Sequence, residues 1–125
     1  MPESLTLAEA AQHYLEMLEQ QGKHQRTIYT YHRDLAQIQA FFGEARQIHT
    51  ITLPLMGRFL KSEELLMLPN GSPRAKQTTQ KTIRVFRMLL IWLQQTGALP
   101  EINLPKSMQR KGKGAGSSKL QYPYE

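Results

Sequence analysis

Two segments of this chain carry basic, amide and hydroxyl side chains at helical spacing, and such a set can bind a polyanion. In both segments the steps alternate between four and three residues, which places each set on one face of an α-helix. Arginine, lysine, glutamine and threonine hydrogen-bond phosphates and the edges of bases. The sets are Arg26, Thr30, Arg33 and Gln37 in the first segment, and Gln77, Lys81 and Arg84 in the second.

The charge of the chain agrees with a polyanionic partner. Its 125 residues include 16 lysines and arginines against 10 acids, a formal net charge of +6. Residues 74–87 hold five bases and no acid, and residues 106–119 hold five more without an acid. One such run is commonly just a solvated face. Two of them in a small chain favour nucleic acid or an acidic membrane surface as partner.

Catalytic and metal-binding constellations are missing from the sequence. There is no cysteine, which excludes disulfides, thiolate metal sites and thiol catalysis. The only aspartate is Asp34, and Glu63 and Glu64 are neighbours that face different sides of a helix. No two histidines have the spacing of a metal site. The histidines are His13, His24, His32 and His49. We therefore expect no catalysis, no metal ion and no cofactor in this chain.

The N-terminus and the hydropathy pattern argue against secretion and membrane insertion. Residues 1–4 have neither a positive region nor an apolar stretch behind them. The longest apolar-rich run, residues 88–93, is far shorter than the roughly 20 residues of a membrane span. We expect one cytoplasmic domain, with no membrane partner and no small-molecule substrate.

The first basic set lies on the second of two helices predicted for the first part of the chain. Thr6 and Glu9 match a capping box, which begins a helix that ends at Gly22. Its apolar residues are Leu7, Ala11, Tyr14 and Leu18. A second helix ends at Gly43 and has the most regular apolar stripe of the chain. That stripe consists of Ile28, Tyr31, Leu35, Ile38 and Phe42.

The second half of the chain predicts a short helix and a long one. Thr52 is the expected N-cap of the short helix, whose first turn tolerates Pro54. Its apolar residues are Met56, Phe59 and Leu60. Residues 63–68 either extend this helix or form another turn, and the pattern leaves both open. The Pro-Asn-Gly-Ser-Pro run at 69–73 then breaks the chain before a long helix over 76–96, which Gly97 ends.

The long helix is apolar over a wide arc, so it packs against more than one neighbour. Its two adjacent apolar faces are Ile83, Phe86, Leu90 and Leu93, and Val85, Leu89 and Trp92. We predict an all-α bundle of four to five helices in which this fourth, long helix is central. Pro100 and Pro105 end the domain, residues 1–105. Residues 106–125 are rich in Lys, Gly and Ser and are predicted to be a flexible basic linker or tail.

Several motifs in this order resemble the core-binding domain of tyrosine recombinases, the phage integrase family. The run from Thr27 through Tyr31 to Asp34-Leu35, followed by Phe41-Phe42, resembles the family's second helix. Its third and fourth helices are matched in turn by Ile51-Thr52 with Phe59-Leu60, and by Thr78-Thr79, Ile83-Arg84, Phe86-Arg87, Trp92-Leu93 and Gly97. Asn103-Leu104-Pro105 stands where these domains enter an interdomain linker. The resemblance covers residues 5–105.

The resemblance implies a SAM-like orthogonal bundle that binds double-stranded DNA. Such a domain clamps one side of a recombination site, while a separate catalytic domain and other protomers carry out strand exchange. The second and long helices would lie against the major groove. The DNA-facing role then falls on Arg26, Thr27, Thr30, Arg33, Lys76, Gln77, Thr78, Lys81 and Arg84. Flanking phosphate contacts would come from Lys23, His24, Arg74 and Arg87.

The chain departs from the family in its catalytic residues. No histidine is followed by arginine three residues later, and the last tyrosines, Tyr122 and Tyr124, stand in a proline-containing tail. We therefore expect either a piece of a longer integrase or a free-standing relative. Two other functions stay open, a stand-alone DNA-binding regulator and a helical protein-interaction module. In the interaction module, the acidic first helix would dock on the basic long helix of a neighbour.

Overall fold

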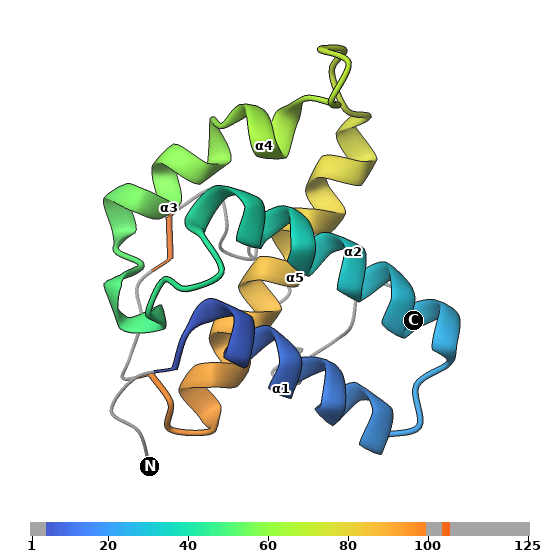
Figure 1. Ribbon diagram of the computed structural model, residues 1–125, viewed down its shortest axis with the longest axis vertical. Helices are drawn as coiled ribbons and strands as arrows, with labels where there is room; N and C mark the ends of the chain where they lie inside the picture. Colours follow the sequence, from blue (N-terminus) through green and yellow to red (C-terminus); the bar gives the residue numbers. More distant parts are fainter. Residues whose placement is uncertain (1–4, 100–103, 106–125) are drawn as a thin grey trace, which may run out of the picture.

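The computed structural model describes residues 5–99 and 104–105, and within them the chain is all-helical (Figure 1). The five α-helices of this part are α1 (Leu7–Gln20), α2 (Gln25–Phe42), α3 (Leu53–Leu60), α4 (Glu63–Leu66) and α5 (Lys76–Gln95). A short 3-10 helix, η1 (Ile48–Thr50), precedes α3. The predicted all-α fold is therefore confirmed, while the predicted tail at 106–125 lies outside the described residues.

The helices begin and end where local chemistry predicts. Thr6 caps α1, because its hydroxyl accepts from the Glu9 amide at 3.1 Å while the Glu9 carboxylate accepts from the Thr6 amide at 3.0 Å. Thr52 caps α3 through the Leu55 amide. Gly22, Gly43 and Gly97, the predicted stops, all have positive φ angles, of 78°, 97° and 89°.

The long helix α5 is central to the bundle. It contacts α1, α2 and α4, and it crosses behind the α1–α2 pair in Figure 1. Eight of its residues are buried, more than in any other helix of the described part. These are Thr79, Thr82, Val85, Phe86, Met88, Leu89, Leu90 and Leu93. A helix buried over so wide an arc joins the layers on either side of it.

A cluster of phenylalanines joins α2, α3 and α5. The Phe86 ring lies 5.3 Å from the Phe42 ring and 5.2 Å from the Phe59 ring, centroid to centroid. Phe41 extends the cluster at 4.9 Å from Phe42. Separations of this size are typical of favourable aromatic pairs. This packing fixes how α2 and α5 lie relative to each other, and therefore the surface between them.

Residues 63–68, which the sequence left open, contain a separate short helix, α4, over Glu63–Leu66. Ser62 caps α4 by accepting from the Leu65 amide at 3.3 Å, so α3 ends before it and the long helix is the fifth rather than the fourth. The breaker run after α4 forms a tight loop. An isolated bridge pairs Met67 with Pro73, and the Gly71 amide, at a φ of 90°, donates to the Leu68 carbonyl at 2.8 Å. The loop delivers the chain directly to the start of α5.

No helix among residues 5–99 and 104–105 is both long and apolar enough to cross a membrane. In the same ranges, no three acidic or histidine side chains gather in a way that could hold a metal ion.

Candidate nucleic-acid interface

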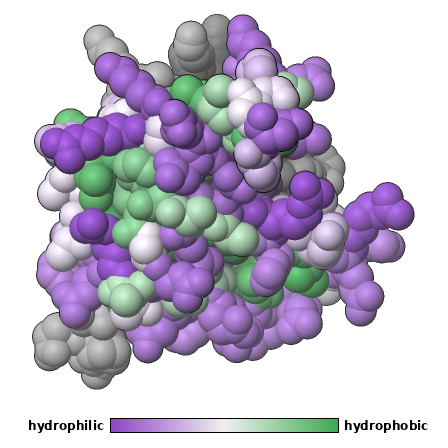
Figure 2. All heavy atoms as spheres, turned by 45° about the horizontal axis from the view of Figure 1, so that its top comes forward, coloured by the Kyte–Doolittle hydropathy of each residue, from purple (hydrophilic) through white to green (hydrophobic). Residues whose placement is uncertain are grey.

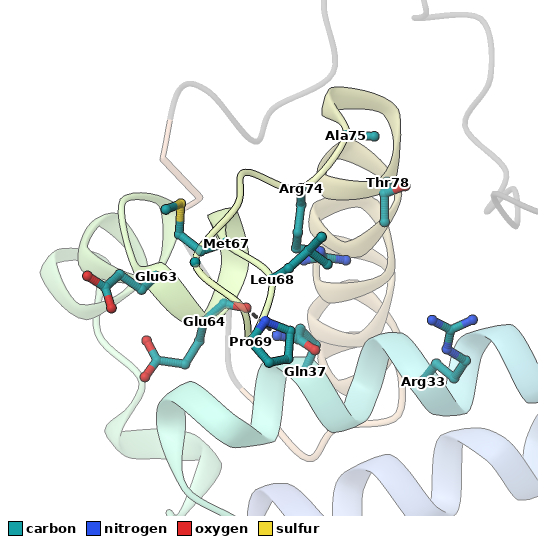
Figure 3. A pocket seen from close by; sticks show the side chains of 11 residues that line it. Arg33, Gln37, Glu63, Glu64, Met67, Leu68, Pro69, Arg74, Ala75 and Thr78 are labelled. Carbon is teal, nitrogen blue, oxygen red and sulfur yellow. Dashed lines mark hydrogen bonds between the residues drawn. The ribbon is translucent and has the colours of Figure 1, made fainter.

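A continuous depression runs between α2, α4 and the first half of α5. Its outer part is an open groove of about 900 Å³, bordered by α4 and the loop that follows it (Figure 3). Its inner part, between α2 and α5, has a volume of about 250 Å³, and we call it the polar hollow. The polar hollow is lined by Thr30, Arg33, Asp34, Gln37, Arg74, Thr78 and Lys81. Four of these, Thr30, Arg33, Thr78 and Lys81, belong to the predicted DNA-facing set and come from both helices, and Arg74 is one of the predicted flanking contacts.

The remaining predicted DNA-facing residues lie outside the polar hollow. Arg26, Gln77 and Arg84 are exposed, and Thr27 is half-buried. At about 100° per residue, Gln77 and Arg84 fall within about 60° of Lys81 around α5, so they continue its wall outward. Lys76 is exposed but turned about 140° away from Lys81. The helix geometry therefore places Lys76 on a different side of α5 from Lys81.

The predicted flanking residues differ in their exposure and in the hydrogen bonds that they make. His24 is the N-cap of α2, where its Nδ1 accepts from the Arg26 amide at 2.9 Å. Lys23 and Arg87 are half-buried, and Arg87 lies about 20° from Lys76 around α5, away from the polar hollow. The His24 side chain therefore already satisfies one of the free backbone amides in the first turn of α2. In contrast, no side chain within the described residues caps α5 at Ala75.

Arg74, a predicted flanking phosphate contact, makes two hydrogen bonds within the fold. Its Nη1 donates to the Leu65 carbonyl at 2.6 Å, and its Nη2 donates to the Thr82 hydroxyl at 3.0 Å. The side chain is half-buried and points back into the fold, as Figure 3 shows. Both bonds use guanidinium protons that a phosphate would otherwise receive. The positive charge of Arg74 therefore lies behind the polar hollow. Its two hydrogen bonds join α4 to α5.

Asp34 and Thr82 form a buried polar contact that the sequence analysis missed. The Thr82 hydroxyl donates to Asp34 Oδ1 at 2.8 Å and joins α5 to α2 across 48 residues of sequence. Asp34 is 7% exposed and Thr82 is fully buried. A signal was present, because Asp34 stands three residues after Tyr31 and four before Ile38, inside the apolar stripe. A lone acid in that register indicates a buried partner.

Gln37 and Thr30 use their polar groups within the protein. The Gln37 amide donates to the Glu64 carbonyl, a contact drawn as a dashed line in Figure 3. The Thr30 hydroxyl donates to the Thr27 carbonyl at 2.9 Å. Glu63 and Glu64 are exposed at the α4 side of the groove. The depression is therefore basic at its α2–α5 end and acidic at its α4 end.

Arg33 has an aromatic neighbour on its own helix. Tyr29 is 62% exposed, and the Arg33 guanidinium carbon lies 6.0 Å from the centre of its ring. That distance is the outer range of a cation–π contact. The contact places the guanidinium on the rim of the polar hollow, on the α2 wall that faces Lys81.

Comparisons with family models, with curated proteins and with solved structures found no match for this chain. The resemblance to core-binding domains therefore remains a prediction from the motifs.

Proposed function

We propose that this chain binds double-stranded DNA through the facing surfaces of α2 and α5. The observation that carries the proposal is the meeting of Arg33 and Lys81 on the two walls of one polar hollow, with the Thr78 hydroxyl beside them. Cationic and hydroxyl groups on helices supply most contacts to DNA phosphates. Gln77 and Arg84 extend this surface outward along α5, where amide and guanidinium groups can reach base edges.

The first turn of α5 adds to the attraction for phosphate. Its amides have no side-chain cap within the described residues, and the helix dipole makes this end partly positive. A B-DNA major groove is about 12 Å wide and admits one helix. One of the two helices would therefore enter the groove while the other contacts the adjacent backbone.

The motif resemblance supports a more specific role for the same surface. As the core-binding domain of a site-specific recombinase, the chain would position DNA for strand exchange by a separate catalytic domain. No residue set in the sequence suggests that the chain carries out this chemistry itself. DNA binding and the recombinase role are tested separately, because DNA binding requires only the surface of α2 and α5 described above.

DNA binding through this surface predicts an affinity that falls as salt rises, and to which Lys81 and Arg84 of α5 contribute. A labelled duplex is titrated with the protein at about 50 mM and about 200 mM salt. The variant Lys81→Ala/Arg84→Ala should bind more weakly at both, and its slope of log K against log salt should be shallower by up to about 1.8. The matched control is Arg58→Ala/Lys61→Ala, which removes the same charge from exposed residues at the end of α3. If both variants lost the same affinity, net charge alone would explain the attraction, and the assignment of the binding surface to α2 and α5 would be contradicted.

A second candidate, a protein-interaction module, is favoured by an apolar tip formed by the last residue of α4 and the two residues after it, a surface different from the α1–α5 docking expected from the charges. Leu66 and Leu68 are 37% and 44% exposed, and Met67 between them is half-buried. Figure 2 shows that hydrophobic side chains reach the surface on the face that it turns forward from the top of Figure 1. Exposed apolar patches of this kind mark interaction sites.

The interaction module predicts self-association that depends on this tip. Sedimentation at rising protein concentration should then give a growing mass for the wild type, and Leu66→Ser/Leu68→Ser should stay monomeric. Because neither side chain belongs to the buried core, the double variant should retain its helical circular dichroism. A wild type that stays monomeric up to millimolar concentration contradicts self-association through this face.

A further inference from the structure

The polar hollow has the size and composition of a seat for one phosphate group. Its volume of about 250 Å³ equals that of about eight water molecules, at about 30 Å³ each. The polar hollow therefore has room for one phosphate group with a few waters, and it opens into the larger groove beside it. Its lining residues are polar or charged throughout.

The charges around the polar hollow favour an anion. Arg33 stands on the α2 wall and Lys81 on the α5 wall, and both side chains are exposed. Arg74 adds positive charge from behind, against the single carboxylate of Asp34, whose Oδ1 already accepts from Thr82. Three cations thus face one anion. The charged groups around the polar hollow therefore sum to a positive charge, which attracts an anion.

The walls of the polar hollow hold a fixed separation. The Asp34–Thr82 bond and the Phe42–Phe86 contact both join α2 to α5, one at the floor and the other in the core beneath. A preorganised pair of cations binds an anion without the cost of ordering two helices. Arg33 is further held at the rim by the Tyr29 ring.

From this arrangement we propose that Arg33 and Lys81 bind one and the same phosphate, a phosphodiester of the DNA backbone. The proposal rests on the proposed DNA-binding function and sharpens it. The two helices then contact the DNA strand at the same phosphate, and they do not make two independent contacts along the duplex. The Thr78 hydroxyl, on the α5 wall beside Lys81, donates the third hydrogen bond to the same group.

A double-mutant cycle tests the shared phosphate. Arg33→Gln, Lys81→Gln and the double variant are titrated with the same duplex over a salt series. Each single substitution should lower the slope of log K against log salt by about 0.9. The double variant should lower it no further than one of the singles, because the phosphate is already lost. Its affinity loss should accordingly be clearly smaller than the product of the two single losses.

The matched control pair is Arg26→Gln with Lys81→Gln. Arg26 is exposed on the same helix as Arg33 but does not line the polar hollow. Its effect should multiply with that of Lys81→Gln, and the slopes should add. Additive slopes for Arg33 and Lys81 as well would overturn the shared phosphate and leave DNA binding intact. All variants change exposed side chains, and unchanged thermal unfolding checks that they fold.

Inorganic phosphate separates this proposal from the DNA function. Millimolar phosphate should shift the NMR signals of the Arg33 and Lys81 side chains in the wild type, and the Lys81 shift should be lost in Arg33→Gln. Such shifts with no duplex binding at low salt would uphold the seat and contradict the DNA function. Duplex binding with multiplicative losses and no phosphate shifts would overturn the seat alone.

Discussion

Replacing Phe86 with alanine is expected to lower the free energy of unfolding by about 3–5 kcal/mol, the range for truncating a buried aromatic side chain. Phe86 is fully buried and contacts the rings of Phe42 and Phe59. Because those rings belong to α2 and α3, the cavity would weaken the packing of three helices at once. Urea denaturation followed by circular dichroism at 222 nm measures the loss.

Two control variants test whether the loss of stability in Phe86→Ala comes from removing a buried ring. Phe86→Leu keeps most of the apolar volume and should lose much less stability. Leu53→Ala removes an apolar side chain that is 45% exposed, and should change stability by about 0.5 kcal/mol or less. A loss below about 1 kcal/mol for Phe86→Ala would contradict the ring cluster as the centre of the core.

Replacing Thr82 with valine is expected to cost about 1–3 kcal/mol, although the shape of the side chain hardly changes. The Thr82 hydroxyl donates to Asp34 and accepts from Arg74, so its removal leaves a buried carboxylate and a guanidinium each short of one partner. The cost of leaving such groups unsatisfied is larger than the net contribution of an ordinary hydrogen bond. Urea denaturation again measures it.

The same substitution at Thr79 provides the control. Thr79 is 8% exposed on the same helix, and its hydroxyl makes no hydrogen bond within the described residues. Thr79→Val should therefore leave stability unchanged or raise it slightly. Thr82→Val should also speed hydrogen exchange at the Arg74 amide, which bonds the Leu66 carbonyl at 2.8 Å. Equal stabilities for the two valine variants would refute the role of the buried network.

The fold and the candidate DNA surface are linked through this network. Arg74 joins Thr82 to the Leu65 carbonyl, so one arginine holds α4 and its loop against α5. The same loop borders the groove whose inner end carries Arg33 and Lys81. A weakened network would therefore loosen the walls of the proposed phosphate seat before it unfolds the bundle.

The sequence by itself determined four of the five α-helices of the described residues, all except α4, and the outward faces of α2 and α5. The Thr6–Glu9 capping box, the Thr52 cap and the glycine stops act over a few residues, so their chemistry can be read along the chain. The same holds for the apolar stripes, because their spacing follows from helix geometry alone. The basic faces are the complement of those stripes.

Only the tertiary structure decided which polar groups meet. A helical wheel gives the faces of one helix but not the rotation of that helix relative to another, which here follows from the packing of Phe42, Phe59 and Phe86. That packing brings Lys81 and Arg33 to the same polar hollow. It also buries Asp34 against Thr82, from 48 residues away. Contacts of this range depend on the whole core, so spacing along the chain does not contain them.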